Sequence, residues 1–136
     1  MKIALLSDIH GNVAALQTVL ADIDAWQPDQ VIVNGDVVNR GPDSPTCWQM
    51  VADRRAQPGW HVLGGNHEFY VCKHANPAPD AEHIGIQADI NQNSRWTYQQ
   101  LNGQVAELAA LPQVFEIAAP DGSRLRATHA SMRGNS

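Results

Sequence analysis

Cysteine is scarce in this sequence of 136 residues, which contains only Cys47 and Cys72. The two are far apart and form no Cys-x-x-Cys pair, so the sequence indicates neither a disulfide framework nor a zinc knuckle. No apolar run approaches the ~20 residues that a helix needs to cross a bilayer, and the first residues contain no secretory apolar segment. These absences predict a soluble, reduced, cytoplasmic protein.

Basic residues are also few. Lys and Arg together number 9 against 14 Asp and Glu, and the formal net charge is −5. Because an acidic chain lacks the positive surface that holds polyanions, we expect no binding to nucleic acid and none to a membrane. The hydrophobic content of 43% allows one modest core. The length predicts a single domain over residues 1–136.

Three apolar stretches each end in polar residues that are able to bind a metal. The central one, Val31–Gly41, reads as a buried strand that delivers Asp36 to a loop at its carboxyl end. The stretches Lys2–Ser7 and Trp60–Leu63 repeat this design. In a parallel sheet all three ends open at the same edge, where α/β proteins place their ligands. We therefore expect one site at this edge, with side chains from Asp8, His10, Asp36, Asn66 and His67.

Helical patterns separate these strands. Asn12 can cap a helix that stops at residues 27–29. Its expected core residues are Leu16, Val19, Leu20, Ile23 and Trp26. After the turn at 42–45, Ser44 is the expected cap of a second helix that reaches about Arg55. Its expected core residues are Cys47, Trp48, Met50 and Val51. Right-handed crossovers would make the strands parallel.

The second half of the chain has weaker patterns. Residues 69–93 show weak periodicity and include a turn-rich run at 76–80. We expect them to form an exposed cap over the strand ends, where such loops often set substrate choice. Two short helices are predicted at 94–101 and 104–111, the second with Val105, Leu108 and Leu111 on one face. Residues 113–117 and 123–128 then read as a hairpin whose second strand runs into His129.

The donors at the strand ends favour a first-row divalent metal over calcium, because they mix carboxylate oxygen, imidazole nitrogen and amide oxygen. They come from Asp8, His10, Asp36, Asn66 and His129. Two cations within ~4 Å need a carboxylate between them, and two-metal sites activate water and clamp a phosphoryl group. Asp36 is the candidate bridge. Taken singly, each motif has a plainer interpretation: a turn-capping Asp8, an exposed Arg40 in a Gly-flanked turn, and a helix-capping Asn66.

Four motifs in order resemble those of the calcineurin-like metallophosphoesterase superfamily. They are Asp8-x-His10, Gly35-Asp36-(x)3-Arg40-Gly41, Gly65-Asn66-His67-Glu68 and His129-Ala130-Ser131, and they span almost the whole chain. The resemblance implies an α/β fold that is part of a four-layer α-β-β-α sandwich, with a parallel first sheet followed by a hairpin. It also implies two divalent metal ions, manganese first and otherwise iron, zinc, nickel, cobalt or magnesium. The reaction implied is attack on phosphorus by a hydroxide held between the metals, in a small phosphate monoester or diester.

Residue roles follow from the resemblance by position. Asp8 and His10 would bind the first metal, and Asp36 would bridge the two ions. Asn66 and His129 would bind the second. His67 would contact the phosphate and protonate the leaving oxygen, and Arg40 would grip phosphate oxygens. The related protein phosphatases read Gly-Asp-x-Val-Asp-Arg-Gly here, and Asn39 replaces their second Asp.

One family motif is missing, a Gly-His-x-His stretch downstream of His129, since the sequence stops at Ser136. We therefore expect an amino-terminal portion with an incomplete second sheet, weak metal affinity, and exposed apolar faces on the hairpin that favour homo-oligomers. Three alternatives stay open: a serine/threonine protein phosphatase, a dinucleotide polyphosphate hydrolase, and a catalytically inactive metal-binding or assembly module. Catalysis through Ser44 or Ser131 as nucleophile lacks an adjacent base.

Overall fold

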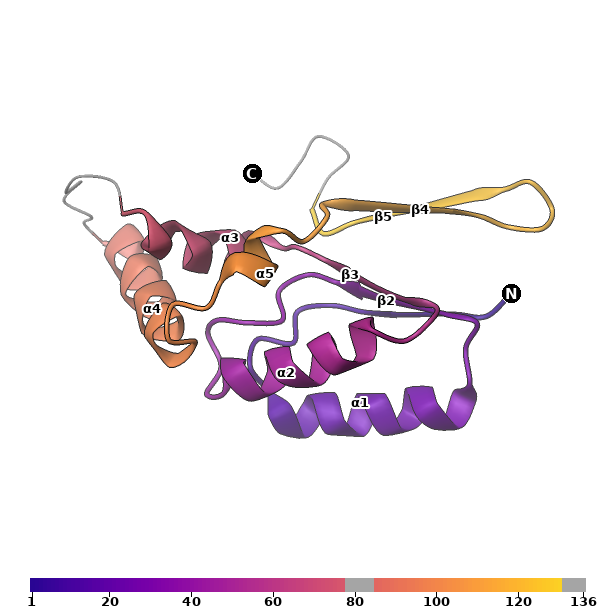
Figure 1. The fold of residues 1–136 in the computed structure, drawn as a ribbon, viewed down its shortest axis with the longest axis horizontal. Coiled ribbons are helices and arrows are strands. Elements are labelled where there is room, and N and C mark those ends of the chain that lie inside the picture. Colours follow the sequence, from indigo (N-terminus) through magenta and orange to yellow (C-terminus); the bar gives the residue numbers. More distant parts are fainter. Residues whose placement is uncertain (78–84, 131–136) are drawn as a thin grey trace.

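The computed structural model describes residues 1–77 and 85–130. Its centre is a parallel sheet in the order β1-β2-β3. The strands are β1 (Ile3–Leu6), β2 (Gln30–Asn34) and β3 (Trp60–Leu63). Helices α1 (Val13–Trp26) and α2 (Ser44–Arg55) connect the strands and cover one face of the sheet (Figure 1). The predicted α/β architecture with a parallel first sheet is confirmed.

Helix α1 begins where the sequence predicts. The Asn12 side chain accepts a hydrogen bond from the backbone N–H of Ala15 at 3.0 Å. The buried side chains of the helix are Leu16, Leu20 and Ile23. Val19 and Trp26 are 40% and 47% exposed, so their expected place in the core is wrong. At 100° per residue both positions lie off one side of the buried stripe.

Helix α2 has a different cap from the one expected. Asp43, rather than Ser44, accepts the N–H of Thr46 at 3.0 Å. Ser44 is fully buried, and its hydroxyl accepts the backbone N–H of Asn39 at 2.9 Å. The residue thus ties the helix start to the loop after β2, where the candidate site lies. Cys47 and Val51 are buried as expected.

Helices occupy most of the described part of region 69–93, which was expected to form an exposed cap. They are α3 (Asn66–Cys72), which begins before that region, the short 3-10 helix η1 (Lys73–Ala75) and the first half of α4 (Ile86–Gln100). Helix α5 (Ala106–Ala109) lies within the second short helix predicted at 104–111. The helix predicted to start at Ser94 begins at Ile86, and residues 78–84 of the expected cap lie outside the described part. The amino-terminal half of α4 escaped prediction because it turns Ile86 and Asp89 to a cavity rather than to the core. Val105, Leu108 and Leu111 are buried as predicted.

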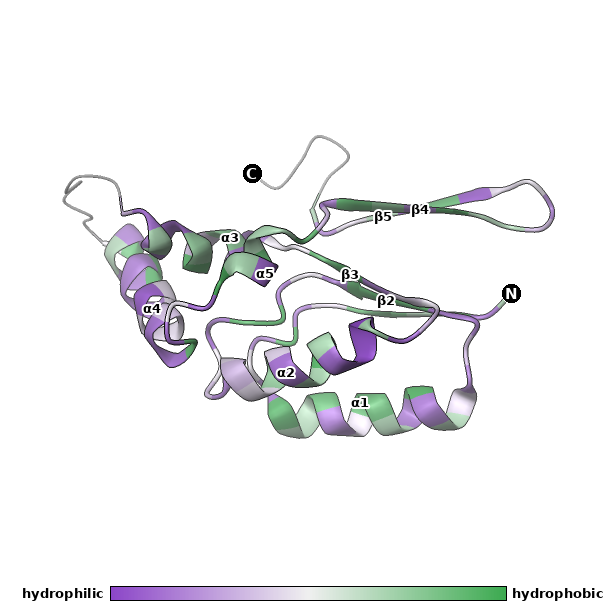
Figure 2. Cartoon of the chain, in the orientation of Figure 1, coloured by the Kyte–Doolittle hydropathy of each residue, from purple (hydrophilic) through white to green (hydrophobic). Residues whose placement is uncertain are grey.

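The predicted hairpin is present as the antiparallel pair β4 (Val114–Ala118) and β5 (Arg124–Thr128). It lies on the face of the parallel sheet opposite α1 and α2 (Figure 1). Phe115 and Ala127 pack there against Ile32 and Leu63. Figure 2 shows apolar stretches along β2 and β3, which lie between helices α1 and α2 on one side and the hairpin on the other. Leu125 is 40% exposed, in line with the expected apolar exposure of the hairpin.

Isolated histidines and tryptophans vary in their surroundings. His61 of β3 is stacked on Phe115 of β4 with ring centroids 3.9 Å apart. His74 is not free in solvent, since its Nε2 lies 2.8 Å from the Ser94 hydroxyl. Trp96 of α4 is 44% exposed. Among the described residues, no helix has both the length and the apolar character needed to cross a membrane.

Candidate metal centre

The ends of β1 and β2 turn sharply through left-handed backbone. Asp8, His10 and Asp36 have φ values of 58°, 49° and 56°, and Asn39 and Arg40 follow at 75° and 68°. Non-glycine residues rarely adopt this region, and such strain persists only where the surroundings hold it. The two loops hold each other, because the N–H of His10 donates to the carbonyl of Asp36 at 2.9 Å. The turns bring the donor side chains to one edge of the sheet.

Glu68 of α3 anchors the loop after β2. Its carboxylate is 2% exposed and accepts the backbone N–H groups of Asp36, Val37, Val38 and Gly65, at 2.7 to 3.1 Å. Burial raises the pKa of Glu68, and the backbone hydrogen bonds oppose that shift. The sequence offered Glu68 only as part of a motif. The structure shows it as the residue that fixes the backbone carrying Asp36.

Gly65 allows α3 to approach Asp36. A Cβ at this position would collide with Oδ1 and the backbone nitrogen of Asp36. The glycine therefore lets the N–H of His67 donate to Asp36 Oδ1 at 3.0 Å. That bond leaves Oδ2 of Asp36 to face the histidines.

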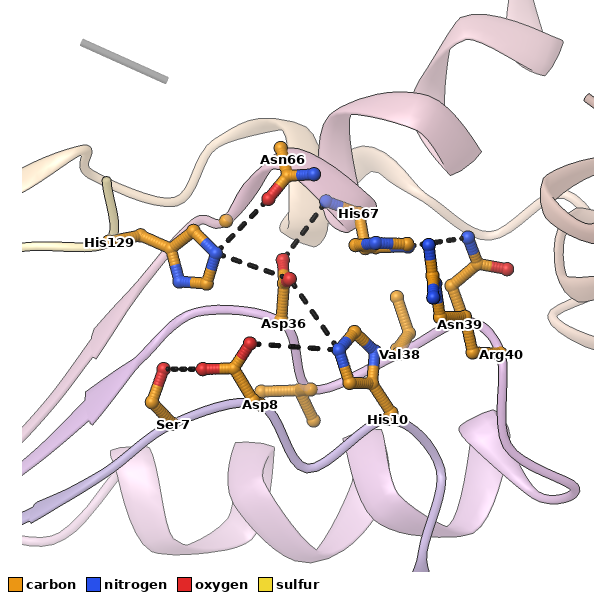
Figure 3. A network of polar contacts seen from close by, with 12 residues as sticks. Ser7, Asp8, His10, Asp36, Val38, Asn39, Arg40, Asn66, His67 and His129 are labelled. Atoms are coloured by element: carbon orange, nitrogen blue, oxygen red, sulfur yellow. Dashed lines mark hydrogen bonds and ion pairs between the residues drawn. The ribbon is translucent and has the colours of Figure 1, made fainter. Parts of the chain in front are cut away.

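The other four predicted ligands lie around Asp36, which is 2% exposed (Figure 3). On one side, Nε2 of His10 is 3.7 Å from Asp36 Oδ2 and 3.7 Å from Asp8 Oδ1. On the other, Nε2 of His129 is 3.2 Å from Asp36 Oδ2 and 3.1 Å from Asn66 Oδ1. Metal–ligand bonds of ~2.0–2.2 Å place two ligands of one ion about 3 to 4 Å apart. These separations match that range.

The orientation of His129 fits a cation. Its Nδ1 lies 2.6 Å from the carbonyl oxygen of Asn34, which can only accept a hydrogen bond. In the neutral ring the proton therefore sits on Nδ1, and the lone pair of Nε2 points at Asp36 and Asn66. Three lone-pair donors then face one another, an arrangement that a divalent cation stabilises. Within the described residues, Nδ1 of His10 has no hydrogen-bond partner, so its tautomer is not fixed in this way.

Two clusters of donor atoms, each within 4.8 Å, share the Asp36 carboxylate. One contains Asp8, Asp36 and His129, and the other His10, Asp36 and His67. This grouping differs from the pairing implied by the resemblance, which set Asp8 with His10 and gave His67 no metal. Asp36 keeps its central position in both groupings. The allocation of the other ligands to either ion stays a prediction.

His67 is held by a buried pair on its far side. The Thr97 hydroxyl donates to Asn39 Oδ1 at 2.8 Å, which turns Nδ2 of Asn39 toward Nδ1 of His67 at 2.9 Å. Since Nδ2 donates, the proton of the neutral ring sits on Nε2. Burial lowers the pKa of His67, against the pull of Asp36, and favours this neutral ring. Sequence reasoning gave Thr97 no role in the site.

Arg40 lies beside Asn39, on the opposite side of His67 from His129 (Figure 3). Its backbone N–H donates to Oδ1 of Asn93 on α4 at 3.0 Å. Its left-handed backbone is thus supported by a helix that is distant in sequence. The side chain lines a cavity shared with His67, so the predicted phosphate-contacting residues border the same space.

Together, the parallel sheet and its edge of carboxylate, imidazole and amide donors define an α/β protein with a candidate metal site. The sequence matches the model of the calcineurin-like phosphoesterase family over residues 1–123. The chain belongs to this family, and the resemblance noted from its motifs is confirmed.

Known relatives are longer than this chain. A symmetrical bis(5'-nucleosyl)-tetraphosphatase of Paracidovorax citrulli is 36% identical over 80 residues, 57% of this chain and 28% of the relative. One from Shewanella baltica is 31% identical over 103 residues, covering 70% and 36%. A metallophosphoesterase from Sphaerobacter thermophilus superposes with a TM-score of 0.61 at 28% identity, over 87% of this chain and 44% of that one. The matched part of the chain thus covers only 28% to 36% of the length of these two curated relatives.

Proposed function

We propose that this chain carries the metal-binding edge of a phosphoesterase that hydrolyses phosphate monoesters or diesters with two divalent ions. The observation that supports it most is the arrangement around Asp36, where Nε2 of His129 lies 3.2 Å from the carboxylate and 3.1 Å from Oδ1 of Asn66. A divalent cation bound among these atoms would be stabilised by the carboxylate charge and by the imidazole and amide lone pairs. The family of the chain gives the reaction class.

Asp8, His10, Asp36, Asn66 and His129 would hold the ions, with Asp36 between them. When bound, the ions would lower the pKa of a water and offset the charge on the phosphoryl oxygens. The mixed nitrogen and oxygen donors suit manganese, iron or zinc, and manganese is our choice for reconstitution.

Two neighbouring residues would act on the substrate itself. The guanidinium of Arg40 can grip two phosphate oxygens at once, a geometry that a lysine would not supply. His67 would donate its Nε2 proton in a hydrogen bond to the phosphate or to the leaving oxygen, since Asn39 occupies Nδ1. General acid help of this kind contributes roughly 10²–10⁴-fold.

A second candidate is a hydrolase of dinucleotide polyphosphates. The names of the two tetraphosphatase relatives favour it. Both candidates use the same metal-binding edge of the sheet. They differ in the leaving group that is released when its bond to phosphorus breaks.

Hydrolysis of p-nitrophenyl phosphate and its bis-ester with added manganese tests the proposal. We expect turnover that depends on manganese and falls at least ~100-fold in Asp36→Asn, because the neutral amide removes the charge between the ions. Asp53→Asn changes an exposed carboxylate of α2 and serves as the matched control. Manganese binding without turnover would contradict the enzyme and support the non-catalytic binding module.

A further inference from the structure

A cavity of ≈ 390 Å³ opens beside His67, between the loop after β2 and helix α4. Its size falls in the range of small-molecule sites. One side carries the groups expected to meet phosphate, and the other carries one face of α4. The residues that matter here are Arg40, His67, Ile86, Asp89, Ile90 and Asn93.

The orientation of α4 toward the site is fixed by its carboxyl-terminal half. Asn93 accepts the backbone N–H of Arg40, and Thr97 donates to Asn39. Ile86 and Ile90 precede these residues at helical spacing and therefore lie on the same face. The helix thus docks through polar contacts at one end and presents apolar side chains to the cavity at the other.

The α4 wall of the cavity combines apolar and acceptor character. Ile86 is 76% exposed, and neither it nor Ile90 belongs to the hydrophobic core. Exposed aliphatic side chains that line a concave surface mark ligand sites more often than bare surface does. Between them, the exposed carboxylate of Asp89 can accept hydrogen bonds but repels a further anion. Across the cavity, Arg40 attracts an anion.

We propose that this cavity binds the leaving group of the phosphoester, and that Ile86, Asp89 and Ile90 select an uncharged group with a flat apolar face and hydroxyl donors, such as a nucleoside. The inference rests on the proposed phosphoesterase function and names its substrate class. The scissile phosphate lies toward Arg40 and His67, the flat face stacks on the isoleucines, and the hydroxyls donate to Asp89. A leaving group that carries its own phosphates is disfavoured by Asp89.

Kinetics with three substrates test this selection in the full chain with manganese. Adenosine monophosphate releases a nucleoside, glycerol phosphate a small alcohol, and adenosine diphosphate a charged nucleotide. Ile90→Ala should lower kcat/KM for adenosine monophosphate relative to glycerol phosphate by roughly tenfold, since the lost contact involves only the larger group. Asp89→Asn should raise kcat/KM for the diphosphate relative to the monophosphate by roughly fivefold, because it removes a repulsive charge.

Arg95→Ala is the matched control on α4, because Arg95 is exposed and lies on the side of the helix away from the cavity. It should leave both ratios as they are in the unmodified chain. If Ile90→Ala lowers the rates for all substrates alike, or if Asp89→Asn leaves the diphosphate ratio unchanged, the selection is wrong while the phosphoesterase function stands.

A binding measurement separates failure of this inference from failure of the proposed function. In the full chain with magnesium, adenosine should shift the NMR signals of the Ile86 and Ile90 methyl groups and leave that of Ile117 on the hairpin in place. Those shifts in a chain that hydrolyses nothing would support the cavity and reject the proposed reaction. Unmoved Ile86 and Ile90 signals at millimolar adenosine would overturn the cavity assignment, whatever the activity.

Discussion

His129 and Asp36 meet at the candidate metal centre from opposite layers of the fold, with Nε2 of the histidine 3.2 Å from Oδ2 of the carboxylate. Asp36 follows β2 of the parallel sheet, and His129 follows β5 of the hairpin. Their contact therefore requires the hairpin to be packed on the sheet, through Phe115 and Ala127. The hairpin contributes to the site as well as to the core.

The first prediction concerns His129→Ala. Removing the imidazole takes away a donor whose tautomer the Asn34 carbonyl has set, so one ion should bind at least tenfold more weakly, about the loss seen for supporting ligands of metal sites. Manganese titration followed by calorimetry would measure this. His74→Ala, which removes an imidazole bonded to Ser94 away from the cluster, should leave both affinities in place. If His129→Ala binds manganese as tightly as the unmodified chain does, His129 is not a metal ligand.

The second prediction concerns Glu68→Gln. The amide keeps the shape of the side chain but turns one NH₂ group toward backbone N–H donors, so at least one buried donor loses its acceptor. We expect a loss of about 3 kcal/mol in the free energy of unfolding, measured by urea denaturation. Weaker manganese binding should accompany it, because the same bonds hold the backbone of Asp36. Glu107→Gln, at an exposed position of α5, should change stability by less than about 0.5 kcal/mol.

The third prediction compares neighbouring glycines. Gly65→Ala places a methyl group against the Asp36 carboxylate and backbone, which cannot move without breaking the contacts of the loop. We expect lower thermal stability together with loss of manganese-dependent stabilisation. In Gly64→Ala the methyl group meets first the end of the Gln113 side chain, at 2.8 Å, which is the tip of a long side chain rather than backbone. A Gly65→Ala variant that binds manganese as tightly as Gly64→Ala would contradict the close approach.

The parts of this fold that can be predicted are those in which residues close together in the sequence determine the local structure. The β2 stretch is apolar and β-branched up to Gly35, and Asn12 sits directly before an apolar helical pattern, so strand, cap and helix follow from the sequence. Asp8, His10, Asp36 and Asn66 converge because parallel strands open at one edge. That rule holds without knowledge of the packing.

The parts that escaped prediction depend on contacts between distant segments. Asn93 and Thr97 attach α4 to the loop after β2 through hydrogen bonds. Contacts of this kind produce no periodic pattern of apolar residues in the sequence. Ser44 was expected to cap its own helix, but its hydroxyl accepts a hydrogen bond from the backbone N–H of Asn39 instead. The burial of Glu68 likewise follows from the closeness of α3 to that loop, which the tertiary fold alone sets.

The last prediction is a pH dependence of stability that arises from protonation of His61. This ring lies between the parallel sheet and the hairpin, stacked on Phe115, with Nε2 2.7 Å from Oε1 of Gln30. Burial lowers the pKa of His61 below the 6.5 of an unperturbed histidine. Between the two pKa values the unfolded chain binds more protons than the folded one, so stability falls as pH drops through 6.5 toward the lower folded value.

His61→Phe tests that dependence, because the ring keeps its stacking and cannot be protonated. Melting temperatures recorded from about pH 7 to about pH 5 should fall less steeply in the variant than in the unmodified chain, with His67 and His74 accounting for the slope that remains. Since stacking is kept, the two proteins should differ least at the upper end of the range. If the melting temperatures of the two proteins fall in parallel over the whole pH range, His61 binds its proton equally well in the folded and unfolded chains. The packing of the hairpin on the sheet then does not respond to pH at this ring.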